Sequence, residues 1–152
     1  MSKNARFLSP ISLSGPYVVS SEFWISDSAP KNGARCDIGV DVDDGGLVHE
    51  DGTYLLSTSM AVTVSLIETD GSGEDGDEKA RMFVAMVGTV HVEDAISDDE
   101  ELVYESLKMN AVSMFYASAR GYIEQMTAMS PMQRFTIPAI DPKALLDSIA
   151  AE

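Results

Sequence analysis

The sequence has a single cysteine, little positive charge and no long apolar run. Cys36 is the only cysteine among 152 residues, which excludes an intramolecular disulfide and a cage of several thiolates around a metal ion. A lone thiol is easiest to keep in a reducing compartment, so we expect a cytoplasmic location. No segment approaches the roughly 18 apolar residues of a membrane span, and residues 1–13 lack the apolar core of a signal peptide. We therefore expect no membrane insertion.

Positive charge is scarce as well, because ten Lys and Arg residues face 25 Asp and Glu residues for a net charge of −15. We expect no nucleic-acid partner, since phosphate binding needs clustered cations. Between residues 37 and 105 there are 19 of the acids, and Lys79 and Arg81 are the only bases there. Hydrophobic residues still make up 45% of the chain, so a core can form, and the length favours a single domain over residues 1–152.

Four segments show the alternation of apolar and polar residues that predicts β-strands. The clearest is 54–67, which is apolar on one face and small and polar on the other. Residues 35–43 place aspartates on the exposed face of a second strand, and residues 81–92 are apolar on both faces, which predicts a strand covered on both sides. The first strand begins irregularly within residues 7–17, where two prolines restrict it to an edge.

The connections between these strands are predicted to be turns. Acidic, glycine-containing segments at 43–46, 50–52 and 70–78 separate consecutive strands, and short turns of this kind join antiparallel strands. The first of the three is expected to end the second strand. The sequence therefore predicts an antiparallel sheet.

After the fourth strand the apolar period changes to that of a helix. Ser97 and Glu100 have the spacing of a capping box, which predicts a helix from about Asp98 that closes at Pro131. Its apolar stripe recurs every three or four residues and consists of Val112, Phe115, Tyr116, Ala119, Ile123 and Met126. Asp141–Pro142 predicts the start of a short last helix. The predicted fold class is α+β, a four-stranded antiparallel sheet followed by a long helix packed on it and a short C-terminal helix.

Motifs of catalysis and metal binding are missing. The sequence has no Gly-x-Ser-x-Gly, His-Glu-x-x-His or P-loop pattern, and His49 and His91 each lack a partner at ligand spacing. The acidic loop 70–78 fails the calcium register, because Asp75 stands where the loop needs Gly and Arg81 where it needs a bidentate Glu. We therefore expect no enzyme activity, no metal and no cofactor.

Two groups of apolar residues leave alternatives open. Phe23, Trp24 and Ile25 are predicted to follow the first strand in a connection that continues into a polar loop at residues 26–30, and they form either an extension of the core or a binding surface. Five of the nine methionines lie in or just after the long helix. Methionine fills gaps in a core, or it provides an adaptable apolar surface for varied ligands.

The order of elements and several local motifs resemble the SecB family of export chaperones. The motifs are Ala119–Arg120 with Ile123, Pro138–Ala139–Ile140–Asp141, Ala144–Leu145, and Ala80 and Gly88 in the fourth strand. The resemblance extends from about Ile11 to Leu146. It implies an ATP-independent holdase that binds unfolded or precursor polypeptides in apolar grooves and keeps them soluble and translocation-competent. It also implies a homotetramer built as a dimer of dimers.

The resemblance implies two sets of site residues. Those expected to bind polypeptide are Phe23, Trp24, Ile25, Phe135, Leu145, Leu146 and Ile149. Those expected at the oligomer interface are Phe83 and Ala85 of the doubly apolar strand and the small-residue stripe Ser113, Ala117 and Gly121. Small residues permit close approach of another backbone, and a second copy would cover the apolar strand.

The family contacts the SecA motor through acids, and this chain has Ser20, Trp24 and Val84 at those positions. An alternative is therefore a SecB-like adaptor or chaperone for a dedicated client, such as an antitoxin, that does not bind SecA. A further alternative is a hotdog-fold thioesterase or dehydratase. That fold requires its long helix after the first strand, and a catalytic carboxylate or His.

Overall fold

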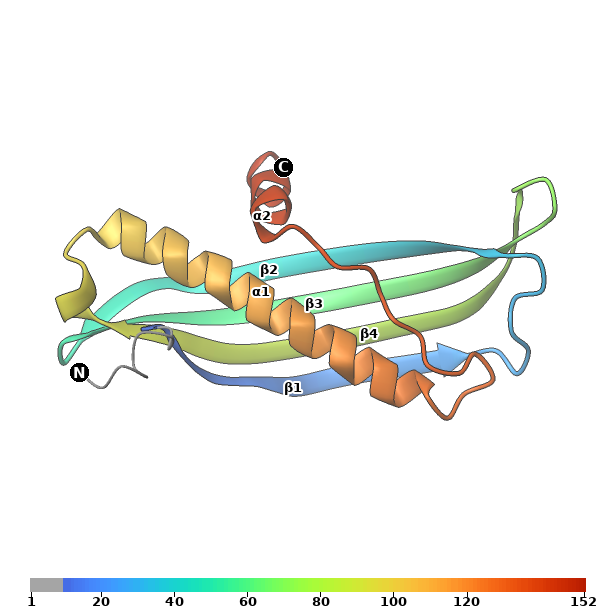
Figure 1. The fold of residues 1–152 in the computed structure, drawn as a ribbon, viewed down its shortest axis with the longest axis horizontal. Coiled ribbons are helices and arrows are strands. Elements are labelled where there is room, and N and C mark those ends of the chain that lie inside the picture. The colour runs from blue at the N-terminus through green and yellow to red at the C-terminus, as the bar shows by residue number, and fades with distance from the viewer. Residues whose placement is uncertain (1–9) are drawn as a thin grey trace, which may run out of the picture.

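The computed structural model describes residues 10–152, which form one sheet and two α-helices (Figure 1). The elements in chain order are β1 (Ser12–Ile25), β2 (Ala34–Glu50), β3 (Thr53–Thr69), β4 (Asp75–Glu93), the 3-10 helix η2 (Asp94–Ile96), α1 (Glu100–Thr127) and α2 (Pro142–Ala150). The part of the predicted first strand at Phe7 lies outside the described residues.

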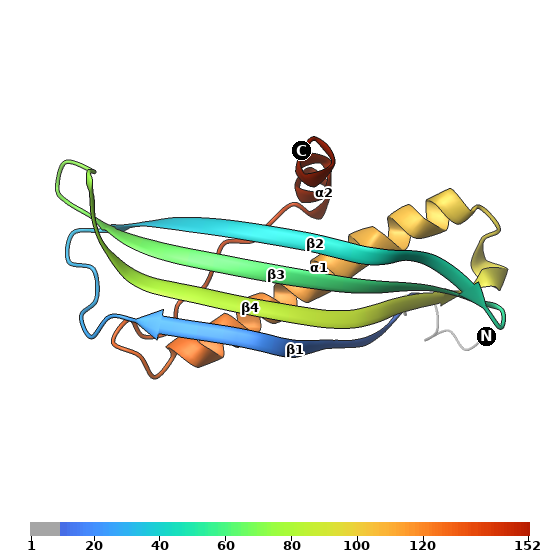
Figure 2. The same ribbon diagram turned by 180° about the vertical axis from the view of Figure 1, so that it is seen from behind.

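The four strands form an antiparallel sheet in the order β1-β4-β3-β2, so β1 and β2 are its edges. The helix α1 crosses one face of the sheet diagonally (Figure 1), and no described element covers the opposite face (Figure 2). The predicted fold is confirmed. Because the long helix follows all four strands, the element order differs from that of a hotdog fold.

Alternation along the two central strands determines which side chains enter the core. Met82, Val84 and Met86 of β4 are buried against α1, whereas Phe83 and Ala85 face the other way and are only half-buried. The buried residues of α1 include the predicted stripe from Val112 to Ile123, but Met126 is 45% exposed. Each fully buried aliphatic or aromatic side chain contributes about 1.5–3 kcal/mol, so this interface holds the helix on the sheet.

The prediction that residues 43–46 end the second strand is wrong. Pairing of β2 with β3 shifts register between Asp44 and Leu47 and then continues to Glu50, so the segment is a β-bulge. Gly46 has φ +82°, a conformation that glycine adopts without steric cost. The Asp44 Oδ1 accepts a hydrogen bond of 2.8 Å from the Gly46 N–H, which stabilises the bulge without ending the strand.

Three other boundaries differ from the prediction. Residues Phe23–Ile25 belong to β1 itself, because the strand stays paired with β4 as far as Ile25 and Ala80. The helix cap is Asp99, whose Oδ1 accepts from the Leu102 N–H at 3.1 Å, so Ser97 is not the cap. At the other end, α1 stops at Thr127, before Pro131 is reached.

The segment 128–141 returns beside α1 and leads to α2 (Figure 1). The Tyr116 hydroxyl donates to the Pro138 carbonyl at 2.6 Å, and the Arg120 Nε donates to the Ile137 carbonyl at 2.9 Å. Ile137 is fully buried. Asp141 caps α2 as predicted, with Pro142 as its first residue. Neither described helix combines the length and the apolar character that a membrane span requires.

Candidate functional site

The face of the sheet opposite α1 is the candidate site, and strand pairing arranges its side chains in rows. Directly paired residues on antiparallel strands share a face, so each row runs from β1 through β4 and β3 to β2. The four rows are Tyr17–Val87–Ser59–Asp43, Ser20–Ala85–Ala61–Asp41, Glu22–Phe83–Thr63–Gly39 and Trp24–Arg81–Ser65–Asp37. We call this surface the open face. Its chemistry changes from one edge of the sheet to the other.

The β1 and β4 side of the open face carries its large apolar residues, interspersed with Ser20, Glu22 and Arg81. Tyr17 is 62% exposed and Trp24 is 53% exposed. Val19, which lies at the register shift of β1, is 60% exposed. Val87 is exposed beside them, and Phe83 is half-buried. Single exposed apolar residues are ordinary, but a group of large ones on one surface marks an interaction site.

The β2 side of the open face is acidic. Asp37 pairs with Arg35 at 3.0 Å, and the same guanidinium pairs with Asp75 at 2.6 Å. Within residues 10–152, Asp41 and Asp43 have no basic partner. Two unneutralised carboxylates therefore stand on the same face of one strand, opposite the apolar side.

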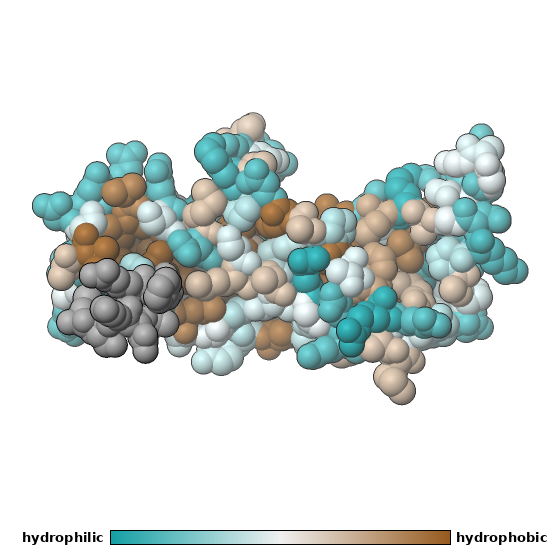
Figure 3. Space-filling model, viewed as in Figure 1, coloured by the Kyte–Doolittle hydropathy of each residue, from teal (hydrophilic) through white to brown (hydrophobic). Residues whose placement is uncertain are grey.

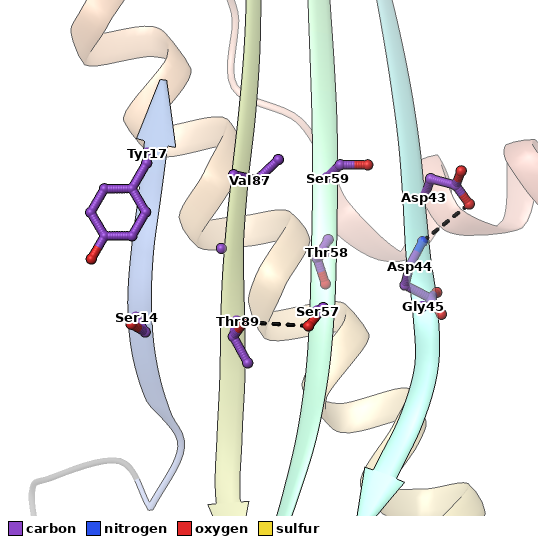
Figure 4. Close-up of a pocket in the computed structure, with 11 residues that line it drawn as sticks. Ser14, Tyr17, Asp43, Asp44, Gly45, Ser57, Thr58, Ser59, Val87 and Thr89 are labelled. Carbon is purple, nitrogen blue, oxygen red and sulfur yellow. Dashed lines mark hydrogen bonds between the residues drawn. The ribbon is translucent and has the colours of Figure 1, made fainter. Parts of the chain in front are cut away.

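Small residues between these two sides leave the open face hollow. A cavity of about 720 Å³ is lined by open-face residues of all four strands, by Ile38, Val40 and Val42 on the other face of β2, and by Leu145, Ser148, Ile149 and Glu152 at α2, so it extends from the open face around the β2 edge. A second hollow of about 450 Å³ lies over the bulge of β2, and Figure 4 shows Tyr17, Val87, Ser59 and Asp43 aligned across it. A third, of about 610 Å³, lies beside Trp24 and Phe83.

The predicted polypeptide-binding residues are divided between two surfaces. Trp24 lies on the open face, whereas Phe23 and Ile25 point toward α1 and pack on the core. The Phe23 ring lies 5.9 Å from that of Tyr122. Phe135, Leu145 and Leu146 are half-buried against the same core. Ile149 lines the cavity at α2.

The predicted oligomer-interface residues also lie on two opposite surfaces. Phe83 and Ala85 belong to the open face, and the stripe of Ser113, Ala117 and Gly121 is exposed on α1. A methyl group added at Gly121 would meet no atom within 4 Å, so nothing in the described chain needs a glycine there. On the α1 side, apolar residues form separate patches among hydrophilic ones (Figure 3).

One partly buried acid connects β2 to α1. The Asp44 Oδ2 accepts from the Tyr104 hydroxyl at 2.9 Å and lies 3.3 Å from the Lys108 Nζ. Burial raises the pKa of Asp44, but the hydrogen bonds from Gly46, Tyr104 and Lys108 outweigh it and hold the pKa below its ordinary value. Asp44 is therefore an ionised, satisfied structural group next to the open face.

The described residues hold no cluster of three or more His, Cys, Asp and Glu that could bind a metal ion. His49 Nε2 lies 2.9 Å from Asp94 Oδ2, and its ring stacks on Tyr54 at 4.3 Å. Both members of this pair are exposed to solvent at the end of the sheet, and it lines none of the hollows of the open face. The arrangement of the open face suits contact with another molecule through apolar and charged side chains.

Sequence reasoning missed Tyr17 and Val19 as site residues. The signal available was the run Tyr17–Val18–Val19 immediately after Pro16, since three consecutive large residues on an edge strand cannot all face the core. The acids Asp41 and Asp43 were correctly placed on the exposed face of their strand.

No protein-family model and no curated protein matches the sequence. Among solved structures, the fold is similar to that of the Mycobacterium tuberculosis SecB-like chaperone Rv1957 in complex with a ChAD peptide from the Rv1956 HigA1 antitoxin. The TM-score is 0.52 at 13% identity, over 86% of this chain and 91% of that one. A protein of unknown function from Streptococcus agalactiae gives a TM-score of 0.45 at 8% identity, over 85% of this chain and 97% of that one. The chain therefore shares its fold with a SecB-like chaperone.

Proposed function

We propose that this protein is an ATP-independent chaperone that binds unfolded or precursor polypeptides and keeps them soluble and translocation-competent. The observation that carries the proposal is the group of exposed apolar residues on the open face, above all Tyr17, Val19 and Trp24. Each apolar client side chain that becomes fully buried there gains about 1.5–3 kcal/mol. Several weak contacts of this kind raise avidity without requiring one client sequence. The fold shared with a SecB-like chaperone supports the same function.

Acidity supports this function in a second way. A net charge of −15 keeps a protein with exposed apolar surface soluble, and it attracts basic segments at long range. We place such a protein in the cytoplasm.

A chaperone for a dedicated client is the second candidate. Val84, at a position where the SecB family has an acid for SecA contact, is fully buried, while Ser20 and Trp24 provide no charge. The similar Mycobacterium tuberculosis chaperone is in complex with an antitoxin peptide, so an antitoxin-like client is the natural choice for this chain. Capture by purified SecA would favour the general export function, and absence of binding would favour the dedicated adaptor.

Assembly into a homotetramer belongs to the same proposal. The exposed stripe of Ser113, Ala117 and Gly121 permits close approach of α1 from a second copy, and we assign this stripe to the oligomer contact. Phe83 and Ala85 lie on the other side of the molecule, and we assign them to the polypeptide-binding face. Light scattering is expected to give four times 16.4 kDa, and a monomer would contradict the assembly.

The test of the chaperone function is suppression of aggregation. A chemically denatured protein is diluted into buffer with a stoichiometric amount of this protein and no nucleotide, and light scattering by aggregates is followed. We expect suppression by the wild type and weaker suppression by Trp24→Ser. Leu102→Ser is the matched control, because Leu102 is 55% exposed and lies on α1, away from the open face. Unchanged aggregation with the wild-type protein would refute the proposal.

A further inference from the structure

We propose that the open face binds an extended polypeptide segment that crosses the strands from β2 to β1. A Lys or Arg of the segment lies over Asp41 and Asp43, and an apolar side chain four positions away lies over Tyr17 and Val19. This inference rests on the proposed function, and it adds the face that is used, the direction of the bound segment and the spacing of its residues.

The acidic end of the path is defined by charge without a partner. Asp41 and Asp43 alternate on β2, so their carboxylates share the open face about 7 Å apart along the strand. Arg35 neutralises Asp37, but no base within residues 10–152 reaches the other two. Glu152 lines the same cavity. A cationic side chain is the complementary occupant. Its attraction to these carboxylates is strongest at low salt, because the carboxylates are exposed.

The apolar end of the path lies on the opposite edge of the sheet. Tyr17 and Val19 are each at least 60% exposed, and Val87 is 39% exposed beside them. The apolar surface of these three residues is therefore exposed to water. Burial of a partner's aromatic or aliphatic side chain over them removes that surface from both molecules.

The middle of the path is shaped to receive a backbone. Ala85 pairs with Ala61, and Val87 pairs with Ser59, so the two central strands present mostly small side chains between the acidic and apolar ends. These residues line the cavity of about 720 Å³. An extended segment lies against this floor without displacing a large side chain.

The width of the sheet determines the spacing. Three inter-strand gaps of about 4.8 Å separate β2 from β1, which makes a path of about 14 Å. An extended chain advances about 3.3 Å per residue, so about four residues cover it. Residues four apart in an extended chain point to the same side, and both can therefore face the sheet. A spacing of three would turn one of them away.

A second copy of this chain is a poorer occupant of the open face. It would bring a net charge of −15 and the same unneutralised aspartates toward Asp41 and Asp43. Like charges at short range oppose association. A basic segment gains from the same charges.

The experiment uses the full chain and fluorescent nine-residue peptides in a background of Ser and Ala. One peptide has Lys and Trp four positions apart, a second has them three apart, and a third has Glu in place of Lys at the spacing of four. Fluorescence anisotropy at low salt gives the dissociation constants. We expect the first peptide to bind at least about threefold more tightly than either of the others, and added salt to reduce the difference.

Matched variants locate the binding. Asp41→Asn with Asp43→Asn is expected to weaken the first peptide about threefold to tenfold. Glu74→Gln with Asp77→Asn changes the net charge by the same amount at a different place, in and just after the loop between β3 and β4. This pair is expected to leave binding unchanged. Tyr17→Ser is expected to weaken every Trp peptide.

The outcomes separate this inference from the proposed function. Equal binding of the Lys and Glu peptides, or equal weakening by the two charge-removing pairs, overturns the inference, and suppression of aggregation then still supports the chaperone. Dimerisation that Tyr17→Ser abolishes also overturns it, because the face then contacts a second copy. Failure of every peptide together with unsuppressed aggregation overturns both.

Discussion

Substitution of Gly88 by alanine tests the packing of α1 against the sheet. Gly88 lies in β4 opposite Thr58 of β3, where the Phe115 ring of α1 packs on the strand. A Cβ at this position would lie 2.9 Å from Phe115 Cζ, 2.8 Å from the Ser14 carbonyl oxygen and 3.3 Å from Pro16 Cα. The ring can rotate away, but the β1 backbone has to move as a whole.

The expected cost follows from these contacts. Overpacking a tight interior costs about 1–3 kcal/mol, and it exceeds the gain of at most about 1 kcal/mol that alanine brings over glycine in a strand. We expect Gly88→Ala to lower the free energy of unfolding by about 1–2 kcal/mol, and Tm by about 2–8 °C for a chain of this size. Urea unfolding followed by circular dichroism measures the first quantity.

A control and a second variant make this test specific. Gly39 is a strand glycine with no atom within 4 Å of an added Cβ, so Gly39→Ala is expected to leave stability unchanged or slightly raised. Phe115→Leu should shrink the penalty of Gly88→Ala in a double-mutant cycle, because it removes one of the two closest contacts. A Gly88→Ala protein as stable as the wild type would refute the reasoning.

Three further predictions concern α1 and its partners. Gly121→Ala is expected to stabilise the dissociated chain by about 0.5–1 kcal/mol and to weaken its assembly; unchanged light scattering at high concentration would contradict the stripe as an interface. Tyr116→Phe removes the 2.6 Å hydrogen bond to Pro138 and is expected to cost about 0.5–1.5 kcal/mol, with faster amide exchange in residues 137–141; unchanged exchange there would contradict an anchoring role. Asp44→Asn is expected to cost about 1–3 kcal/mol at pH 7. Since the folded pKa of Asp44 is lowered, its contribution is complete above the unfolded pKa of about 3.9 and is lost as pH falls through the folded value. Urea unfolding at pH 7 and at pH 2 is therefore expected to show a large difference from wild type at the first pH and a small one at the second; a difference independent of pH would contradict the role of the charge.

The sequence predicted the elements whose signals are local. Alternation over residues 54–67 correctly separates the buried and exposed faces of β3, because side-chain direction in a strand follows from the backbone alone. Asp141–Pro142 correctly predicts the start of α2 for a similar reason, since a cap needs only the next few amides. The long amphipathic pattern likewise predicts α1.

The wrong predictions arose where a distant part of the chain decides the local structure. Residues 43–46 have the composition of a turn, but pairing with β3 and the contacts of Asp44 with Tyr104 and Lys108, about 60 positions away, hold them within a strand. Phe23–Ile25 lie in β1 because β4 continues to pair with them. Local composition does not contain these interactions.

The sequence by itself determined an acidic chain, an antiparallel sheet followed by a long helix, and aspartates on the exposed face of β2. The tertiary structure alone decided that those aspartates share an uncovered face with Tyr17 and Val19. The order β1-β4-β3-β2 places the first and second strands at opposite edges, so residues close in sequence are separated by the full width of the sheet. Pairing energy and the packing of α1 set that order, and the distribution of apolar and acidic side chains on the open face follows from it.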